Sequence, residues 1–109
     1  MDDLIDWHQV RALHGDVGAD MFEEVFTFFE LETREILSDL GPATDWRAAM
    51  HALKGSAQTV GFAAAAAACA QAEAKAAEGR AGASDVPRIT ALLEQSHAAF
   101  RAGRRAHGI

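Results

Sequence analysis

The chain has 109 residues, which is enough for one domain with a single hydrophobic core. Half of the residues are apolar, so a packed fold is expected rather than disorder. Sixteen acidic residues against ten basic ones give a net charge of −6, which argues against nucleic acid as the main partner.

The first half of the chain predicts one short helix and one long helix. Asp6 is expected to cap a first helix that reaches about Leu13, with residues 15–18 as the break after it. The second helix is predicted from about residue 19 to residue 40, where Gly41 and Pro42 stop it. Its inward stripe follows helical spacing and comprises Phe22, Val25, Phe26, Phe29, Thr33, Ile36, Leu37 and Leu40.

Three further helices are predicted in the second half. One begins at the N-cap Asp45 and ends near Gly61, and the next spans about residues 62–78. After a loop over residues 80–83, Ser84 is expected to cap the last helix. Its inward stripe comprises Ile89, Leu92, Leu93, Ser96 and Phe100. We therefore expect residues 1–109 to form one all-α domain, an antiparallel up-and-down four-helix bundle with a short additional N-terminal helix across one end.

Several sequence features indicate where in the cell the protein is expected to lie. Cys69 is the single cysteine, so an internal disulfide is excluded, and its alanine-rich surroundings predict a small buried side chain. The acidic N-terminus lacks the apolar region of a signal peptide. The alanine-rich run is broken by Gln71, Glu73 and Lys75, so it is not expected to span a membrane. We expect a cytoplasmic protein without membrane association.

One face of the third predicted helix is polar and carries Arg47, His51, Lys54, Gly55 and Gln58. The opposite face carries Trp46, Ala49, Met50, Leu53, Ala57 and Val60. His51 should therefore point to solvent, where an imidazole is a competent nucleophile near neutral pH. Attack on a phosphoryl group would give a phosphoimidazole, which Lys54 at i+3 could stabilise and to which Arg47 at i−4 could add positive charge.

Gly55 and Glu73 are the two other unusual residues around this histidine. A glycine within a helix costs roughly 1 kcal/mol relative to alanine, and at i+4 from His51 it would open a path to the ring for a partner. The alternative is that Gly55 permits close packing. Glu73 is predicted on the apolar side of the fourth helix, about level with His51. It would either accept a hydrogen bond from Nδ1–H of His51, leaving Nε2 free, or reach water at the edge of the core.

The run from His51 to Ala57, His-Ala-Leu-Lys-Gly-Ser-Ala, followed by Gly61, closely resembles the signature of histidine-containing phosphotransfer (HPt) domains. Asp45, Trp46, Cys69 and Glu73 also look like that family, although alanines fill much of the fourth helix where members more often have larger apolar residues. The resemblance implies a four-helix bundle in which Nε2 of His51 carries phosphate.

The same resemblance implies roles for the neighbours of His51. Lys54 would steady the phosphoryl group, Gly55 would make room for the aspartate pocket of a receiver domain, and Glu73 would hold the ring. Gln58 matches a polar position on the same face. The partners implied are a sensor histidine kinase and a response-regulator receiver domain, and Mg²⁺ would belong to the receiver's acidic site.

Met21 and Phe28 lie off the core stripe of the second helix, on a flank shared with Glu24 and Glu32. They are candidates for an apolar docking surface for the receiver. The alternative is that they pack on the short first helix.

No metal site or nucleotide-binding loop is expected. The other histidines lack metal-ligand spacing, and no HExxH, CxxC or glycine-rich phosphate loop is present. The leading interpretation is a monomeric, non-enzymatic phosphocarrier without a cofactor, starting at Met1 as a free-standing protein. The alternatives are a helical adaptor that binds a receiver or kinase without accepting phosphate, and the phosphoacceptor domain of a larger chemotaxis-type kinase.

Overall fold

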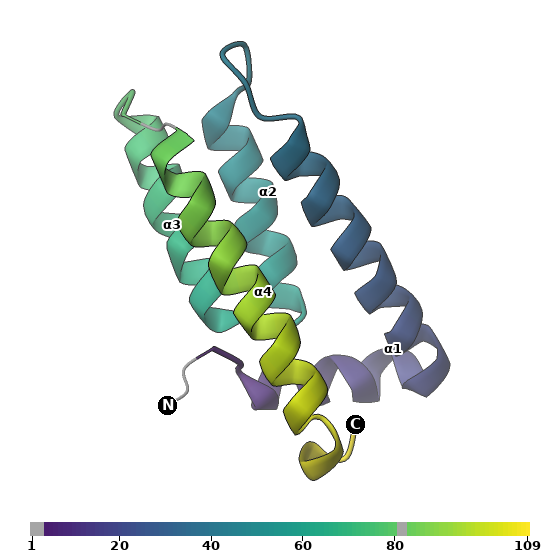
Figure 1. Cartoon of the computed structure of the whole chain (residues 1–109). Coiled ribbons are helices and arrows are strands. Elements are labelled where there is room, and N and C mark those ends of the chain that lie inside the picture. Colours follow the sequence, from purple (N-terminus) through teal and green to yellow (C-terminus); the bar gives the residue numbers. More distant parts are fainter. Residues whose placement is uncertain (1–3, 81–82) are drawn as a thin grey trace.

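The computed structural model describes residues 4–80 and 83–109. Within those residues the regular structure is entirely helical, as the sequence predicts (Figure 1). Four α-helices, α1 (Trp7–Ser38), α2 (Trp46–Thr59), α3 (Ala63–Ala77) and α4 (Val86–Gly103), are accompanied by two short 3₁₀ turns, η1 (Ala83–Asp85) and η2 (Arg105–His107).

Helix α1 bends sharply at Gly18, so that its first part lies across the end of the bundle in Figure 1. We expected a break over residues 15–18, but the helix continues through Val17 and only Gly18 leaves helical geometry, with φ 85° and ψ 161°. A glycine adopts this conformation without a Cβ clash, so one residue is enough to redirect the chain. The helix also ends two residues earlier than predicted, at Ser38 rather than Leu40.

Helices α2 and α3 are the pair that forms the candidate site. The Asp45 carboxylate accepts a hydrogen bond from the backbone N–H of Ala48, so Asp45 caps α2 as predicted. The chain then turns at Gly61, whose φ is 82°, and α3 lies alongside α2 from there. A Cβ on Gly61 would come within 2.6 Å of Val10 Cγ2 and 2.8 Å of the Asp6 carbonyl oxygen, so this turn also anchors the start of α1.

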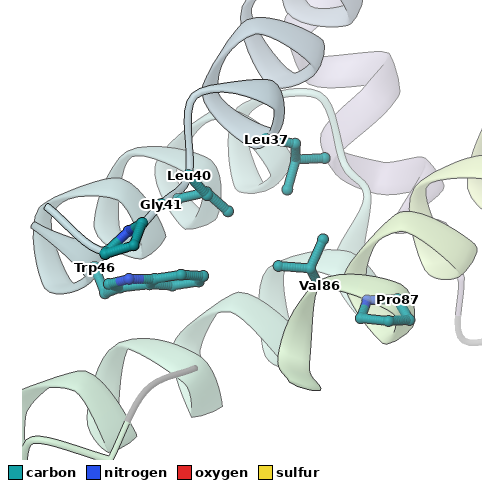
Figure 2. Close-up of a pocket in the computed structure, with 7 residues that line it drawn as sticks. Leu37, Leu40, Gly41, Trp46, Val86 and Pro87 are labelled. Carbon is teal, nitrogen blue, oxygen red and sulfur yellow. The ribbon is translucent and has the colours of Figure 1, made fainter. Parts of the chain in front are cut away.

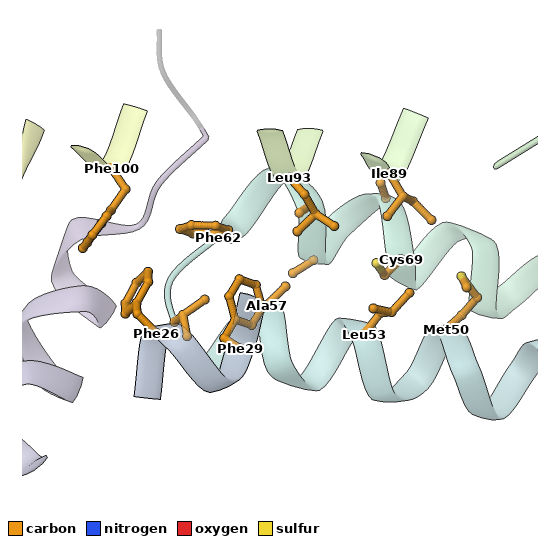
Figure 3. Close-up of a cluster of buried hydrophobic side chains, with 14 of the residues drawn as sticks. Phe26, Phe29, Met50, Leu53, Ala57, Phe62, Cys69, Ile89, Leu93 and Phe100 are labelled. Atoms are coloured by element: carbon orange, nitrogen blue, oxygen red, sulfur yellow. The ribbon is translucent and has the colours of Figure 1, made fainter. Parts of the chain in front are cut away.

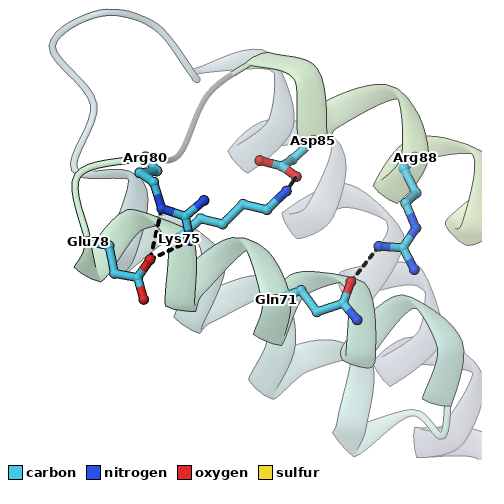
Figure 4. A network of polar contacts seen from close by, with 6 residues as sticks. All are labelled: Gln71, Lys75, Glu78, Arg80, Asp85 and Arg88. Atoms are coloured by element: carbon cyan, nitrogen blue, oxygen red, sulfur yellow. Dashed lines mark hydrogen bonds and ion pairs between the residues drawn. The ribbon is translucent and has the colours of Figure 1, made fainter.

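The start of α4 differs from our expectation. Ser84 does not cap the helix, because η1 comes first and α4 begins at Val86. Asp85 occupies the N-cap position without a side-chain capping bond, since its carboxylate accepts a 2.8 Å hydrogen bond from Lys75 Nζ. Together with the hydrogen bond from Arg88 to Gln71, this pair joins α4 to α3 (Figure 4). The charged side chains of Lys75, Asp85 and Arg88 therefore stabilise the contact between α3 and the start of α4.

The core is built from apolar residues of all four helices (Figure 3). Phe26 stacks on Phe100 with ring centroids 4.3 Å apart, and Phe29 meets Phe62 edge to face. Cys69 is buried, as the sequence predicts. Most of the core residues that α3 supplies are alanines, namely Ala65, Ala66, Ala68 and Ala72. Their small side chains let α3 approach its neighbours closely. None of the helices described is long and apolar enough to cross a membrane.

Candidate functional site

His51 projects from the outer face of α2, and its side chain is 70% exposed. Nδ1 of the ring lies 2.9 Å from Oε2 of Glu73 on α3, so the hydrogen bond expected between the two helices is present. The other carboxylate oxygen, Oε1, lies 2.7 Å from Nζ of Lys54. One carboxylate therefore joins the histidine and the lysine, and all three side chains meet where α2 and α3 lie side by side.

The electrostatics of this trio keep Glu73 ionised. The Lys54 ammonium, and after it the hydrogen bond from His51, lower the pKa of the Glu73 carboxyl below its ordinary value. Helical spacing predicts that Ala70 and Ala77 share the apolar face of α3 with Glu73. This prediction was partly wrong, because both alanines are exposed in the structure. Glu73 lies at the edge of the buried face, with 19% of its side chain exposed, and reaches across to α2 rather than inward.

The hydrogen bond determines which ring nitrogen of His51 is available for chemistry. An ionised carboxylate can only accept, so Nδ1 must carry the proton that lies between the ring and Glu73. Neutral imidazole then has its lone pair on Nε2, at the other side of the ring. The arrangement therefore presents an oriented nucleophilic nitrogen, with a cation one helical turn away.

The other polar residues predicted on this face of α2 are placed as follows. Arg47 and Gln58 are exposed on the helix, one turn before and two turns after His51. Gly55 is exposed, and a Cβ built on it would meet no described atom within 4 Å. The alternative that Gly55 permits close packing within the chain is therefore wrong for the described residues. Ser56 faces away from His51 and donates a 2.6 Å hydrogen bond to Glu32 on α1.

The two apolar docking candidates on α1 are both open to solvent. Met21 is 50% exposed and Phe28 is 65% exposed, so packing on the first part of α1 does not cover them. The structure adds Leu31, 56% exposed, which sequence reasoning missed. Its position three residues after Phe28 was the available signal, since residues three apart share a helix face.

An apolar hollow lies elsewhere on the bundle. A cavity of about 540 Å³ opens at the end of the bundle where α1 ends and α4 begins (Figure 2). It is lined by Leu37, Leu40, Gly41, Pro42, Trp46, Val86 and Pro87, none of which carries an ionisable side chain. Because it lacks convergent polar groups, it offers no chemistry comparable with that at His51. Within the described residues, no group of three or more His, Cys, Asp or Glu side chains could hold a metal ion.

Comparison with protein-family models assigns this helical chain to a known family, since the model described as Hpt domain matches residues 24–102. This match covers most of the chain, and the protein belongs to the Hpt domain family. Searches of curated proteins and of solved structures gave no match.

Membership of this family establishes the general kind of function. Hpt domains take part in histidine phosphotransfer in two-component signalling, as phosphocarriers rather than as enzymes. They interact with kinases and with receiver domains. The residues and partners through which this chain does so are the subject of the proposals that follow.

Proposed function

We propose that this chain is a phosphorelay carrier that holds a phosphoryl group on Nε2 of His51, between a sensor histidine kinase or receiver and another receiver. The hydrogen bond between His51 Nδ1 and Glu73 carries this proposal, because it orients the ring and leaves Nε2 free. The scaffold is an antiparallel up-and-down bundle that keeps this nitrogen at the surface of α2.

The transfer step requires no proton to be removed from Nε2. The lone pair on Nε2 attacks phosphorus, a P–N bond forms, and the bond from phosphorus to the donor's aspartate oxygen or histidine nitrogen breaks. The electron pair stays with the donor group. In the next step an aspartate oxygen of the receiver attacks phosphorus, and Nε2 recovers its lone pair. His51 is therefore unchanged after each cycle.

Lys54 and Glu73 assist in different ways. Glu73 holds the ring by accepting from Nδ1–H, so it acts as a positioning residue. Lys54 offsets the negative charge that Glu73 would otherwise present to an incoming phosphoryl group, and its ammonium binds the same carboxylate as the ring does. Arg47, exposed one turn earlier on α2, adds positive charge on the same face.

Docking of the partner uses the surface that continues from His51. Gly55 leaves an opening beside the ring, and Gln58 offers a polar contact one turn further on. Met21 and Phe28 provide apolar area on α1. Any Mg²⁺ needed for transfer belongs to the acidic site of the receiver, and the chain itself acts as a monomer without a cofactor. The free, buried Cys69 supports a cytoplasmic location.

The test is transfer of labelled phosphate from an active kinase or a phosphorylated receiver. We expect acid-labile, base-stable label on the wild-type chain and none on His51→Gln. Glu78→Gln, which changes an exposed glutamate at the end of α3, is the matched control and should label as the wild type does. Equal labelling of wild type and His51→Gln would refute the carrier. Binding to a receiver without any label would instead favour the adaptor.

A further inference from the structure

Three large apolar side chains form an exposed row along α1. Met21, Phe28 and Leu31 are each at least half exposed, and they are the exposed large hydrophobic residues of the described chain. Spacings of seven and three residues place them on one stripe of the helix, about 15 Å long from end to end. Exposed apolar patches are common features of interaction surfaces, so this row is a candidate for one.

The row is continuous with the site around His51. A shallow groove of about 190 Å³ beside Phe28 is lined on its other side by Ser56 and Thr59 of α2. Thr59 lies one turn beyond Gly55, which lies one turn beyond His51. A partner that covers His51 and extends along α2 therefore reaches Phe28.

The two parts of this surface differ in charge. Helix α2 contains Arg47 and Lys54 and no acidic residue, and Glu73 of α3 offsets the charge of Lys54, so Arg47 gives this part its net positive charge. The segment of α1 that bears the apolar row, residues 19–38, contains six carboxylates against Arg34 alone. Glu23, Glu24 and Thr27 line a second groove, of about 330 Å³, beside Phe28 and Leu31.

The carboxylates near the row differ in how they are compensated. Glu23 pairs with Arg104, and Glu32 accepts a hydrogen bond from Ser56. Glu24 is exposed and takes part in no ion pair among residues 4–80 and 83–109. Its charge is therefore available to a partner.

We propose that the docking surface selects and orients its receiver by charge, an inference that rests on the proposed function. The receiver places its acidic phosphoacceptor pocket against the basic face of α2. A second surface of the receiver, an apolar patch bordered by Lys or Arg side chains, covers Met21, Phe28 and Leu31. One of those receiver cations faces Glu24. A receiver turned the other way would place acid against acid, which disfavours that orientation.

The experiment compares Glu24→Lys with Glu94→Lys, a matched charge reversal at an exposed position of α4. Receiver domains from the organism that supplies the chain are screened with the phosphorylated wild type, and the fastest acceptor is retained. We expect Glu24→Lys to lower kcat/KM for transfer about fivefold at low salt, because charges at the rim of an interface act on association. The deficit should shrink to within about twofold near 0.5 M salt, where screening is strong. Glu94→Lys should stay within about twofold of wild type throughout.

A reciprocal change in the receiver completes the test. Its surface Lys and Arg residues are changed to Glu one at a time, and the most damaging change should be partly rescued by Glu24→Lys and not by Glu94→Lys. Equal transfer by Glu24→Lys and Glu94→Lys would overturn the inference. If His51 accepts no phosphate, the proposed function fails, and receiver binding to the unphosphorylated chain decides the inference separately. Equal affinities of the two variants, or no binding by any receiver, would then overturn it.

Discussion

Lys54 Nζ lies 2.7 Å from Glu73 Oε1, and this ion pair joins α2 to α3 beside the exposed histidine. Because the second carboxylate oxygen accepts from His51, the lysine is linked to the ring through the glutamate. In the unphosphorylated chain the trio carries compensated charge, and Nε2 of His51 remains accessible.

The pairing predicts how Glu73 titrates. Lys54→Met removes the largest cause of its lowered pKa, so the pKa of Glu73 should rise toward the ordinary 4.5. Carboxyl ¹³C shifts of Glu73 followed against pH measure this directly. Lys75 lies on the same helix as Glu73 but pairs with Asp85. Lys75→Met should therefore leave the Glu73 titration unchanged. An identical Glu73 titration in wild type and Lys54→Met would contradict the assigned cause.

The same shift predicts an acid-dependent loss of stability. The pKa of Glu73 is lower in the folded chain than in the unfolded chain, so its contribution is complete above about pH 4.5 and is lost as pH falls through the folded value. The difference in unfolding free energy between wild type and Lys54→Met should therefore be present at pH 7 and shrink as pH falls below about 4.5. Urea unfolding at several pH values checks this, and a difference that grows on acidification would be the wrong sign.

Gly55 should separate stability from transfer. A Cβ there meets no described atom, so Gly55→Ala should raise the free energy of unfolding by about 0.5–1 kcal/mol. Gly55→Gln should also fold, yet slow phosphotransfer, because its side chain fills the opening beside His51. Denaturant unfolding and transfer kinetics on the same samples measure both effects. Transfer at the wild-type rate by Gly55→Gln would refute the clearance role.

Gly61 should behave in the opposite way. Its φ of 82° and the 2.6 Å approach of a built Cβ to Val10 Cγ2 leave no room for a side chain. Gly61→Ala should lower the free energy of unfolding by about 3 kcal/mol, from backbone strain and overpacking together. Gly55→Ala is the matched control for the same chemical change at an open position. Equal stability of the two variants would show that the turn at Gly61 adapts.

His97 should give the chain a second dependence on pH. Its ring packs edge to face against Phe62, and burial lowers its pKa from the ordinary 6.5. The positive charges of Arg101 and Arg34 lower the pKa further, whereas the negative charge of Glu30 opposes the shift. Protonation therefore favours the unfolded chain, and stability is lost as pH falls below about 6.5. The unfolding free energy of His97→Gln should fall less between pH 7 and pH 5 than that of wild type. Parallel profiles for the two proteins would rule out this assignment.

The site could be largely predicted because its central elements are local. His51, Lys54 and Gly55 are three and four residues apart on one helix, so their shared face follows from helical geometry alone. Asp45 caps α2 as its residue type predicts, and the apolar stripe of α1 is buried at Phe22, Phe26 and Phe29. Local rules were less reliable at the ends of helices, since η1 precedes α4 and Ser84 does not cap it.

The sequence by itself determined an all-α fold and an outward-facing histidine with a cation and a glycine beside it, because these depend on periodicity within single helices. Only the tertiary structure decided that Glu73 serves both His51 and Lys54, that Gly18 alone redirects α1, and that Leu31 joins Met21 and Phe28 in an exposed row. The Glu73 contacts and the exposure of the apolar row depend on how one helix is rotated and placed against another, and the bend at Gly18 is a single backbone conformation within α1. Packing across the core sets that rotation, and periodicity along one helix does not contain it.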